Sequence, residues 1–199
     1  MNEITVKFKK LDQNAIVPSY AHKGDVGMDM TAISVEYDAE KDMYIYHTGL
    51  SFESDFNVGQ FLFVRSSNCK TEAYLCNHVG IADSAIYRGE IQFRFKNIDS
   101  IHTIAEREAS SAYVMSLETS LKLDPTLDAN KRIEIALEVY NMAKNDIYSR
   151  AKNLEFAPYD VGDRIGQMVF IEYPTVKLIE VEELSDTIRG EGGFGSTGK

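Results

Sequence analysis

Apolar and polar residues alternate in short stretches over the first hundred residues and again over the last forty. A period of two, broken by Gly, Asp and Asn, is typical of many short strands. The predicted strands cover residues 4–8, 33–37, 44–46, 60–64, 90–96, 167–173 and 175–181. We therefore predict a mainly β protein with a sandwich or jelly-roll fold.

The pattern changes between residues 103 and 152, where Ala, Glu, Lys, Met and Leu predominate. Thr103-Ile-Ala-Glu106 has the form of a capping box, and Asp124-Pro125 has the form of a helix start with proline in the first turn. We predict a helical hairpin inserted into the β domain. The predicted organisation is a β domain (1–102 and 153–188), a helical insertion (103–152) and a glycine-rich lid (189–199).

In the second half of the insertion, Ile133, Leu137, Tyr140 and Ile147 recur at multiples of three to four residues. This spacing predicts an amphipathic helix whose apolar face needs a partner. Packing against the sister helix or the β core is the favoured interpretation, and a groove for a partner protein is the alternative.

The chain changes again at its last eleven residues, which hold five of its 13 glycines. Glycine lets backbone N–H groups turn toward an anion. Arg189 adds a cation, Phe194 a ring, and Ser196 and Thr197 add hydroxyls. A solvated tail is the ordinary interpretation of such a composition. The side chains favour a lid that closes over a phosphate-bearing aromatic ligand.

Length and composition fit one soluble domain: 199 residues, 44% hydrophobic and 26% charged. No apolar run approaches the roughly 20 residues that span a bilayer, and the start of the chain does not have the pattern of a signal peptide. We therefore expect a cytoplasmic protein without a membrane partner.

The net charge of −10 argues against direct nucleic-acid binding, which normally needs a basic face. Cys69 and Cys76 have no C-x-x-C spacing, and the four histidines have no zinc-ligand spacing. A phosphate ligand would then be bound by local donors and a divalent cation.

Four further motifs carry polar groups beside glycines or predicted strand ends. They are Gly27-Met-Asp29-Met, Arg65-Ser66-Ser67, the stretch from Asn77 through Gly80, Asp83 and Tyr87 to Gly89, and Arg164-Ile-Gly-Gln167. A carboxylate beside a ring can orient a water as general base. Each motif alone is also explained by a turn residue, a strand end or a core ring.

Taken in order with the tail, the motifs resemble those of the trimeric dUTP pyrophosphatases, over about residues 1–100 and 155–199. The resemblance implies a jelly-roll homotrimer whose active sites are shared between chains. It also implies hydrolysis of dUTP to dUMP and pyrophosphate by water attack on the α-phosphorus. That reaction limits uracil in DNA and supplies dUMP for thymidylate synthesis.

The same resemblance assigns residue roles. It implies that Asp83 is the general base, that the Tyr87 ring lies beneath the deoxyribose, and that Asp29 holds Mg²⁺ through water. The other implied substrate-binding residues are Arg65, Ser66, Ser67 and Gln167 on the phosphate side, Asn77 and Gly80 on the uracil side, and Arg189, Phe194, Gly195, Ser196 and Thr197 in the tail.

Three features depart from the family pattern. Three residues, 84–86, separate Asp83 from Tyr87 where two are usual, and Ser67 stands where glycine is usual. Ser67 fits if its φ is negative. The insertion at 103–152 replaces a short connection, which suggests a phage-type member and a possible regulatory protein partner.

The enzymatic alternative is a dCTP deaminase, a relative that shares the Arg-Ser-Ser motif. That reaction needs a carboxyl acid or base five residues after Gly89, a position occupied here by Arg94, with Glu90 adjacent to Gly89. Deaminases also lack the glycine-rich tail. The pyrophosphatase is the favoured interpretation.

Overall fold

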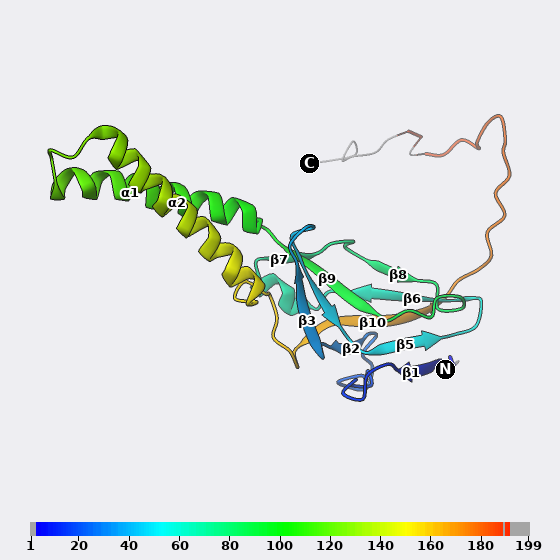
Figure 1. Ribbon diagram of the computed structural model, residues 1–199. Helices are drawn as coiled ribbons and strands as arrows, with labels where there is room; N and C mark the ends of the chain where they lie inside the picture. The colour runs from blue at the N-terminus through cyan, green and yellow to red at the C-terminus, as the bar shows by residue number, and fades with distance from the viewer. Residues whose placement is uncertain (1–2, 189, 192–199) are drawn as a thin grey trace.

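The structure is a computed structural model that describes residues 3–188, 190 and 191, and it confirms a mainly β fold with two helices (Figure 1). Strands β2, β10, β6 and β8 form one four-stranded sheet, β3, β4, β9 and β7 form a second, and β1 pairs with β5. The strands are β1 (Lys7–Lys10), β2 (Met28–Thr31), β3 (Ser34–Asp38), β4 (Met43–His47), β5 (Leu50–Glu53), β6 (Val58–Phe63), β7 (Ala73–Leu75), β8 (Gly80–Ala82), β9 (Gln92–Asn97) and β10 (Arg164–Glu172).

The hydrophobic core lies between the two four-stranded sheets. One sheet contributes Met30, Ile165 and Met168, and the other contributes large rings that are fully buried. These rings are Tyr44, Tyr46, Phe93 and Phe95. Alternate residues of β9 and β10 point into this core, so the intervening residues are free for polar contacts on the other face.

The strand predictions for 33–37, 44–46, 60–64, 90–96 and 167–173 are confirmed within a few residues by β3, β4, β6, β9 and β10. The first strand begins later than predicted, at Lys7. The predicted strand at 175–181 is wrong, because these residues leave β10 without pairing to any described strand. Alternation marks sequences that can form a strand, but a strand also needs a neighbour for its backbone N–H and C=O groups.

The insertion forms a helical hairpin, α1 (Ile101–Leu123) and α2 (Ala129–Lys152), which extends away from the β sheets (Figure 1). The cap predictions are wrong at both helix starts. Ser100, not Thr103, caps α1 by accepting the Thr103 N–H at 3.0 Å. Asp128 caps α2, whereas Asp124 ends α1 and accepts the Thr126 N–H. Each true cap lies a few residues from an equally suitable side chain, so the local sequence did not distinguish the true cap from its neighbour.

Small residues make the contact between the two helices. Ala105 and Ala109 of α1 and Ala136 and Ala151 of α2 are fully buried. Of the predicted apolar stripe only Ile147 is buried at 4% exposure, whereas Ile133 and Leu137 remain 43% and 49% exposed. Packing of the stripe within the chain is therefore confirmed for Ile147 alone.

The base of the hairpin is joined to the second sheet. Ile101, Ala105, Ile147 and Ala151 form a small core with the Tyr37 ring of β3. Asp42, in the turn between β3 and β4, accepts the Ile101 N–H at 3.0 Å and thereby satisfies a free donor at the start of α1. Neither described helix is long and apolar enough to cross a membrane.

Gly166 gives a test of the core. A Cβ at this position would overlap the Phe93 ring. We expect Gly166→Ala to lower the free energy of unfolding by about 1–3 kcal/mol, because a fully buried ring has no space into which to move. Urea denaturation measures the change. Adding Phe93→Leu should reverse part of the loss, and purely additive losses in the double variant would contradict this account.

Candidate active site

A first cluster of predicted site residues lies where β2, β10 and the end of β6 meet. Asp29 on β2 is the register partner of Gln167 on β10, and Gln167 is also the partner of Phe63 on β6. Arg65 follows β6, so the third motif member enters the same place. The predicted motifs around Asp29, Arg65 and Gln167 are thus brought together by strand pairing.

Asp29 is the centre of this cluster, and its side chain is only 10% exposed. Arg65 Nε donates to Oδ1 at 3.0 Å, Gln167 Nε2 donates to the same oxygen at 3.3 Å, and Arg164 Nη1 donates to Oδ2 at 2.9 Å. Two guanidinium groups around one carboxylate leave a net positive charge. Such an arrangement suits an anion with several oxygens, such as a polyphosphate.

Ser66 and Ser67 begin the short 3₁₀ helix η1 (Ser66–Lys70) directly after Arg65. The Ser67 hydroxyl lies 3.4 Å from Arg65 Nη1, and Ser66 is exposed. The φ angle of Ser67 is not positive, so serine can stand at this position where the family usually has glycine.

The described residues contain no group of three or more His, Cys, Asp or Glu side chains that could hold a metal ion. Asp29 is a single carboxylate, and it already accepts from both arginines. A single carboxylate fits a hydrated cation that is bound mainly by the oxygens of a ligand, since Mg²⁺ usually keeps several waters and needs few carboxylates.

A second cluster lines a cavity of about 500 Å³ between β8 and the start of β9. Asn77, Gly80, Asp83 and Tyr87 all contribute to its wall. Asp83 and Tyr87 are both exposed, so a ligand in the cavity can reach the carboxylate and the ring. The remaining lining residues are Met43, Leu62, Cys76, Ile81, Ala82, Glu90, Ile91, Gln92 and Arg94.

The extra residue between Asp83 and Tyr87 is accommodated by a tight turn. The Asp83 carbonyl accepts the N–H groups of Ile86 at 2.8 Å and Tyr87 at 2.7 Å. Ser84 is 1% exposed, and its hydroxyl contacts Ser54 Oγ and the Val58 carbonyl. The carboxylate and the ring therefore line the same cavity despite the longer spacing.

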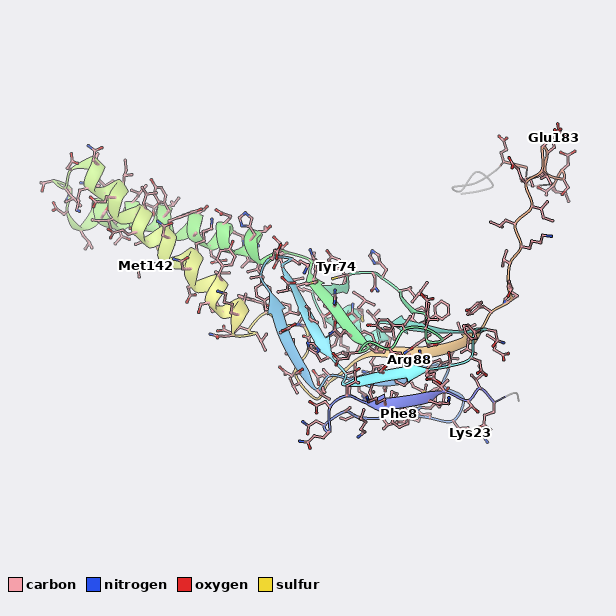
Figure 2. All side chains as sticks on the ribbon, turned by 45° about the vertical axis from the view of Figure 1, so that its right-hand side comes forward. Phe8, Lys23, Tyr74, Arg88, Met142 and Glu183 are labelled. Carbon is pink, nitrogen blue, oxygen red and sulfur yellow. The ribbon has the colours of Figure 1, made fainter. Side chains whose placement is uncertain are left out.

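Arg88 stabilises this turn and was not identified from the sequence. Its Nη1 donates to the carbonyls of Ser84 at 2.9 Å and Tyr87 at 3.0 Å, and its Nη2 donates to that of Ala85 at 3.0 Å. Nη2 also lies 3.3 Å from Glu53 Oε2 on β5 (Figure 2 shows Arg88 beside this strand). The available sequence signal was an arginine directly after a turn, because the backbone carbonyls of a turn lack strand partners and can accept from a guanidinium group.

The two clusters lie far apart within one chain. They are on opposite edges of the sheet β2–β10–β6–β8, and the registers place Asp29 level with Phe63 but the end of β8 level with Gln60. Three strand spacings and about four residues along the strand separate Asp29 from Asp83 by roughly 20 Å. Accordingly, no member of the Asp29 cluster lines the cavity that contains Asp83 and Tyr87.

The predicted tail residues Arg189, Phe194, Gly195, Ser196 and Thr197 lie outside the described residues. The described segment that leads to them, 174–188, carries large apolar side chains that are strongly exposed. They are Val176, Leu178, Ile179, Val181, Leu184 and Ile188. Figure 2 shows Glu183 in this segment, well away from the sheets.

Comparison with known proteins gives consistent results for sequence and fold. A family model described as dUTPase matches residues 126–198. The deoxyuridine 5'-triphosphate nucleotidohydrolase of Crocosphaera subtropica is 31% identical over 193 residues, 97% of this chain and 98% of that protein. The enzyme of the same name from Alkaliphilus metalliredigens is 30% identical over 193 residues, 97% of this chain and 96% of that protein.

Solved structures of phage proteins share the fold. A Staphylococcus bacteriophage 80alpha dUTPase with dUPNHPP matches with a TM-score of 0.59 at 20% identity, covering 98% of this chain and 99% of that chain. A dUTPase from phage phi11 of S. aureus, described with a structural Mg(II) ion, matches with a TM-score of 0.51 at 18% identity, covering 90% and 97%. At these identities the likeness concerns the fold alone.

Proposed function

Because the chain belongs to the dUTPase family, we propose that it hydrolyses dUTP to dUMP and pyrophosphate. The observation that carries the proposal is the cavity in which Asp83, Tyr87 and the β8 backbone lie together. The reaction limits uracil in DNA and supplies dUMP for thymidylate synthesis. We expect it to take place in the cytoplasm.

In the proposed reaction, the Asp83 carboxylate accepts a proton from a water that attacks the α-phosphorus, and pyrophosphate leaves. Asn77 and the backbone near Gly80 bind the uracil edge. The Tyr87 ring lies under the deoxyribose and excludes a 2′-hydroxyl. The exposure of Asp83 and Tyr87 on one cavity supports this division of roles.

Arg65, Ser66, Ser67 and Gln167 bind the triphosphate in this proposal. With substrate bound, the Arg65 guanidinium would bind phosphate oxygens, and Asp29 would hold a hydrated Mg²⁺ through water. The positive surroundings of Asp29 support phosphate binding at this place. When bound, the metal neutralises triphosphate charge and favours departure of pyrophosphate.

We propose that the active form is a homotrimer with shared sites. The water that Asp83 activates must attack the same triphosphate that the cluster around Asp29 binds, yet Asp83 and Asp29 are roughly 20 Å apart in one chain by strand spacing. Bringing them together requires Asp83 of one subunit and Asp29 of another. The exposed apolar side chains of 174–188 support the same conclusion, because such a segment is stabilised by packing on a second chain.

In the assembled enzyme the tail closes over the bound nucleotide. Phe194 stacks on uracil, and Arg189, Gly195, Ser196 and Thr197 contact the phosphates. This assignment rests on the resemblance of residues 189–199 to the family motif. In this proposal, closure of the tail over the nucleotide excludes water from the site.

A substrate panel tests the proposed reaction. We expect pyrophosphate release from dUTP in the presence of Mg²⁺, and little or none from dCTP, dTTP or UTP, because pocket contacts select the base and the sugar. Ion chromatography of the products measures it. Ammonia release from dCTP would instead indicate a deaminase. Against that alternative, the Glu90 carboxylate already accepts from Gly49 and His47, and Arg94 donates to Gln92.

For the helical insertion (103–152) we propose a second, regulatory role through a protein partner. Exposed apolar side chains on both helices favour it, among them Val114, Met115 and Met142 (Figure 2 shows Met142). A pull-down with wild-type protein and with a Val114→Ser/Met115→Ser/Met142→Ser variant tests this role. An identical set of bound proteins would remove the regulatory role and leave the dUTPase proposal unaffected.

A further inference from the structure

The Tyr87 ring rests on the backbone that follows it. Its hydroxyl donates to the Glu90 carbonyl at 3.1 Å. A Cβ at Gly89 would overlap the ring, so only glycine allows this close approach. The position of the ring therefore depends on where the backbone of residues 88–91 lies.

That backbone is attached to the corner between β4 and β5 by hydrogen bonds. Ser51 Oγ donates to the Arg88 carbonyl at 2.9 Å, and the Ile91 N–H donates to the Leu50 carbonyl at 2.8 Å. Thr48 Oγ1 donates to the Ile91 carbonyl at 2.6 Å. These bonds fix the backbone of residues 88–91 to the corner, which joins β4 of the second sheet to β5.

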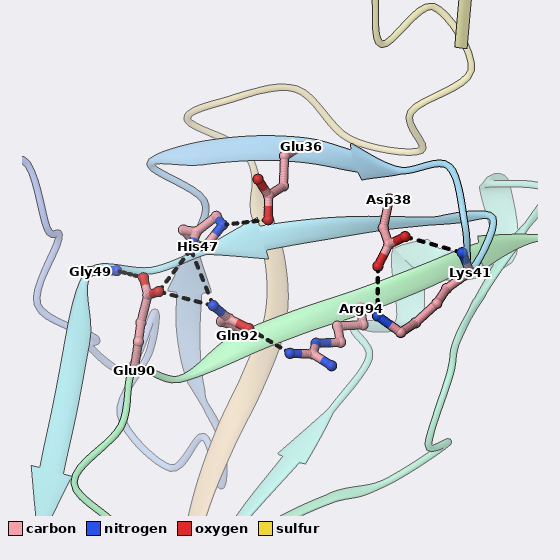
Figure 3. A network of polar contacts seen from close by, with 8 residues as sticks. All are labelled: Glu36, Asp38, Lys41, His47, Gly49, Glu90, Gln92 and Arg94. Carbon is pink, nitrogen blue, oxygen red and sulfur yellow. Dashed lines mark hydrogen bonds and ion pairs between the residues drawn. The ribbon is translucent and has the colours of Figure 1, made fainter. Parts of the chain in front are cut away.

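The Glu90 side chain makes the central contact between these two segments (Figure 3). Its Oε1 accepts the Gly49 N–H at 2.7 Å, and its Oε2 lies 2.7 Å from His47 Nδ1 and 3.2 Å from Gln92 Nε2. Gly49 has a φ of +65°, a conformation that favours glycine and turns its N–H toward the carboxylate. On the other side of the ring, His47 Nε2 lies 3.7 Å from Glu36 Oε1 on β3.

The protons in this network can be assigned from chemistry. Burial raises the pKa of Glu90, but the hydrogen bonds from His47, the Gly49 N–H and Gln92 outweigh burial and keep the pKa below its usual value. An ionised carboxylate only accepts hydrogen bonds. His47 Nδ1 therefore carries the hydrogen in the contact with Glu90, whether the ring is neutral or protonated.

We propose that Glu90 is a positioning residue for sugar selection: by joining the Gly49 N–H and the His47 ring, its carboxylate fixes the backbone that supports Tyr87. The inference rests on the proposed function of Tyr87 as the wall beneath the deoxyribose. In this proposal Glu90 acts through the backbone of residues 88–91 and the Tyr87 ring that rests on it. Loosening it lets the ring move and admits a ribonucleotide.

Glu90→Ala tests the proposal because it removes both contacts of the carboxylate. Glu90→Gln is the conservative variant: its amide oxygen can still accept the Gly49 N–H, and its N–H₂ group takes the place of the second carboxylate oxygen. Support for the Tyr87 ring should therefore be lost in Glu90→Ala and largely kept in Glu90→Gln.

The measurement is the ratio of kcat/KM for dUTP to kcat/KM for UTP, which cancels effects common to both substrates. At about pH 8, we expect Glu90→Gln to lie within about threefold of the wild-type ratio. Glu90→Ala should fall about tenfold below the wild-type ratio at the same pH, as for the net loss of about one hydrogen bond. Circular dichroism shows that both variants fold.

Glu36→Gln is the matched control. It changes a carboxylate beside the same ring, but its side chain is 64% exposed and it does not contact residues 88–91, so the ratio should match the wild type. A wild-type ratio for Glu90→Ala, or equal losses for both substrates, would overturn the proposal. Absence of dUTP hydrolysis by the wild type would instead overturn the proposed function.

Discussion

Asp83→Asn should lower kcat for dUTP by about 10²–10⁴-fold, the range expected when a general base is lost. The amide keeps the size of the carboxylate, so the turn at Ser84 and the Tyr87 ring should stay in place. It cannot accept the proton of the attacking water. Steady-state release of pyrophosphate gives kcat, and calorimetric titration with α,β-imido-dUTP gives the affinity, which should change little.

Asp55→Asn is the matched control for Asp83→Asn, because Asp55 is another exposed aspartate, in the turn between β5 and β6. It lines neither the Asp83 cavity nor the Asp29 cluster. Its kcat should equal that of the wild type within about twofold. Near-normal turnover by Asp83→Asn would show that another group activates the water, whereas a matching loss of affinity would assign Asp83 to substrate binding.

The order of the motifs along the chain predicted that Asp29, Arg65 and Gln167 belong to one site, and strand pairing brings these three side chains together. Their roles toward a substrate stay a prediction. The separation of Asp29 from Asp83 was not visible in the sequence. It depends on strand order within one sheet, which places β2 and β8 at opposite edges.

The contacts that support the Asp83 turn were also beyond sequence reasoning. His47 and Glu90 are 43 residues apart, and their contact exists only because β9 pairs with β4. Arg88 binds carbonyls of its own turn, yet its charge alone did not distinguish that use from a solvated cation. Long-range pairing determines such contacts, and single-sequence patterns report periodicity but not partners.

The helix starts and the segment after β10 show a different limit of prediction from sequence. Ser100 and Thr103 are both suitable caps, and packing of Ile101 against the second sheet decides between them. Residues 175–181 alternate as a strand should, but the chain offers them no partner in its described part. A propensity becomes structure only where a neighbour satisfies it, and here that neighbour is expected in another subunit.

Mixed trimers should recover activity from two inactive variants. Asp83→Asn removes the base, and Arg65→Gln removes a charged phosphate donor, a loss expected to cost about 10²–10³-fold. If each site combines Asp83 of one subunit with Arg65 of another, random co-assembly of the two variants in equal amounts leaves about a quarter of the sites with both residues intact. Co-expression with equal yields, followed by measurement of pyrophosphate release from dUTP, tests this result.

The double variant Asp83→Asn/Arg65→Gln, co-expressed with the wild type, separates shared sites from sites within one chain. Shared sites need an intact residue from each of two subunits, so about a quarter should again remain active. Sites within one chain would leave about half active in this mixture and almost none in the mixture of single variants. A quarter in both mixtures therefore requires that the base and the phosphate donor come from different subunits, because no arrangement confined to one chain gives both values.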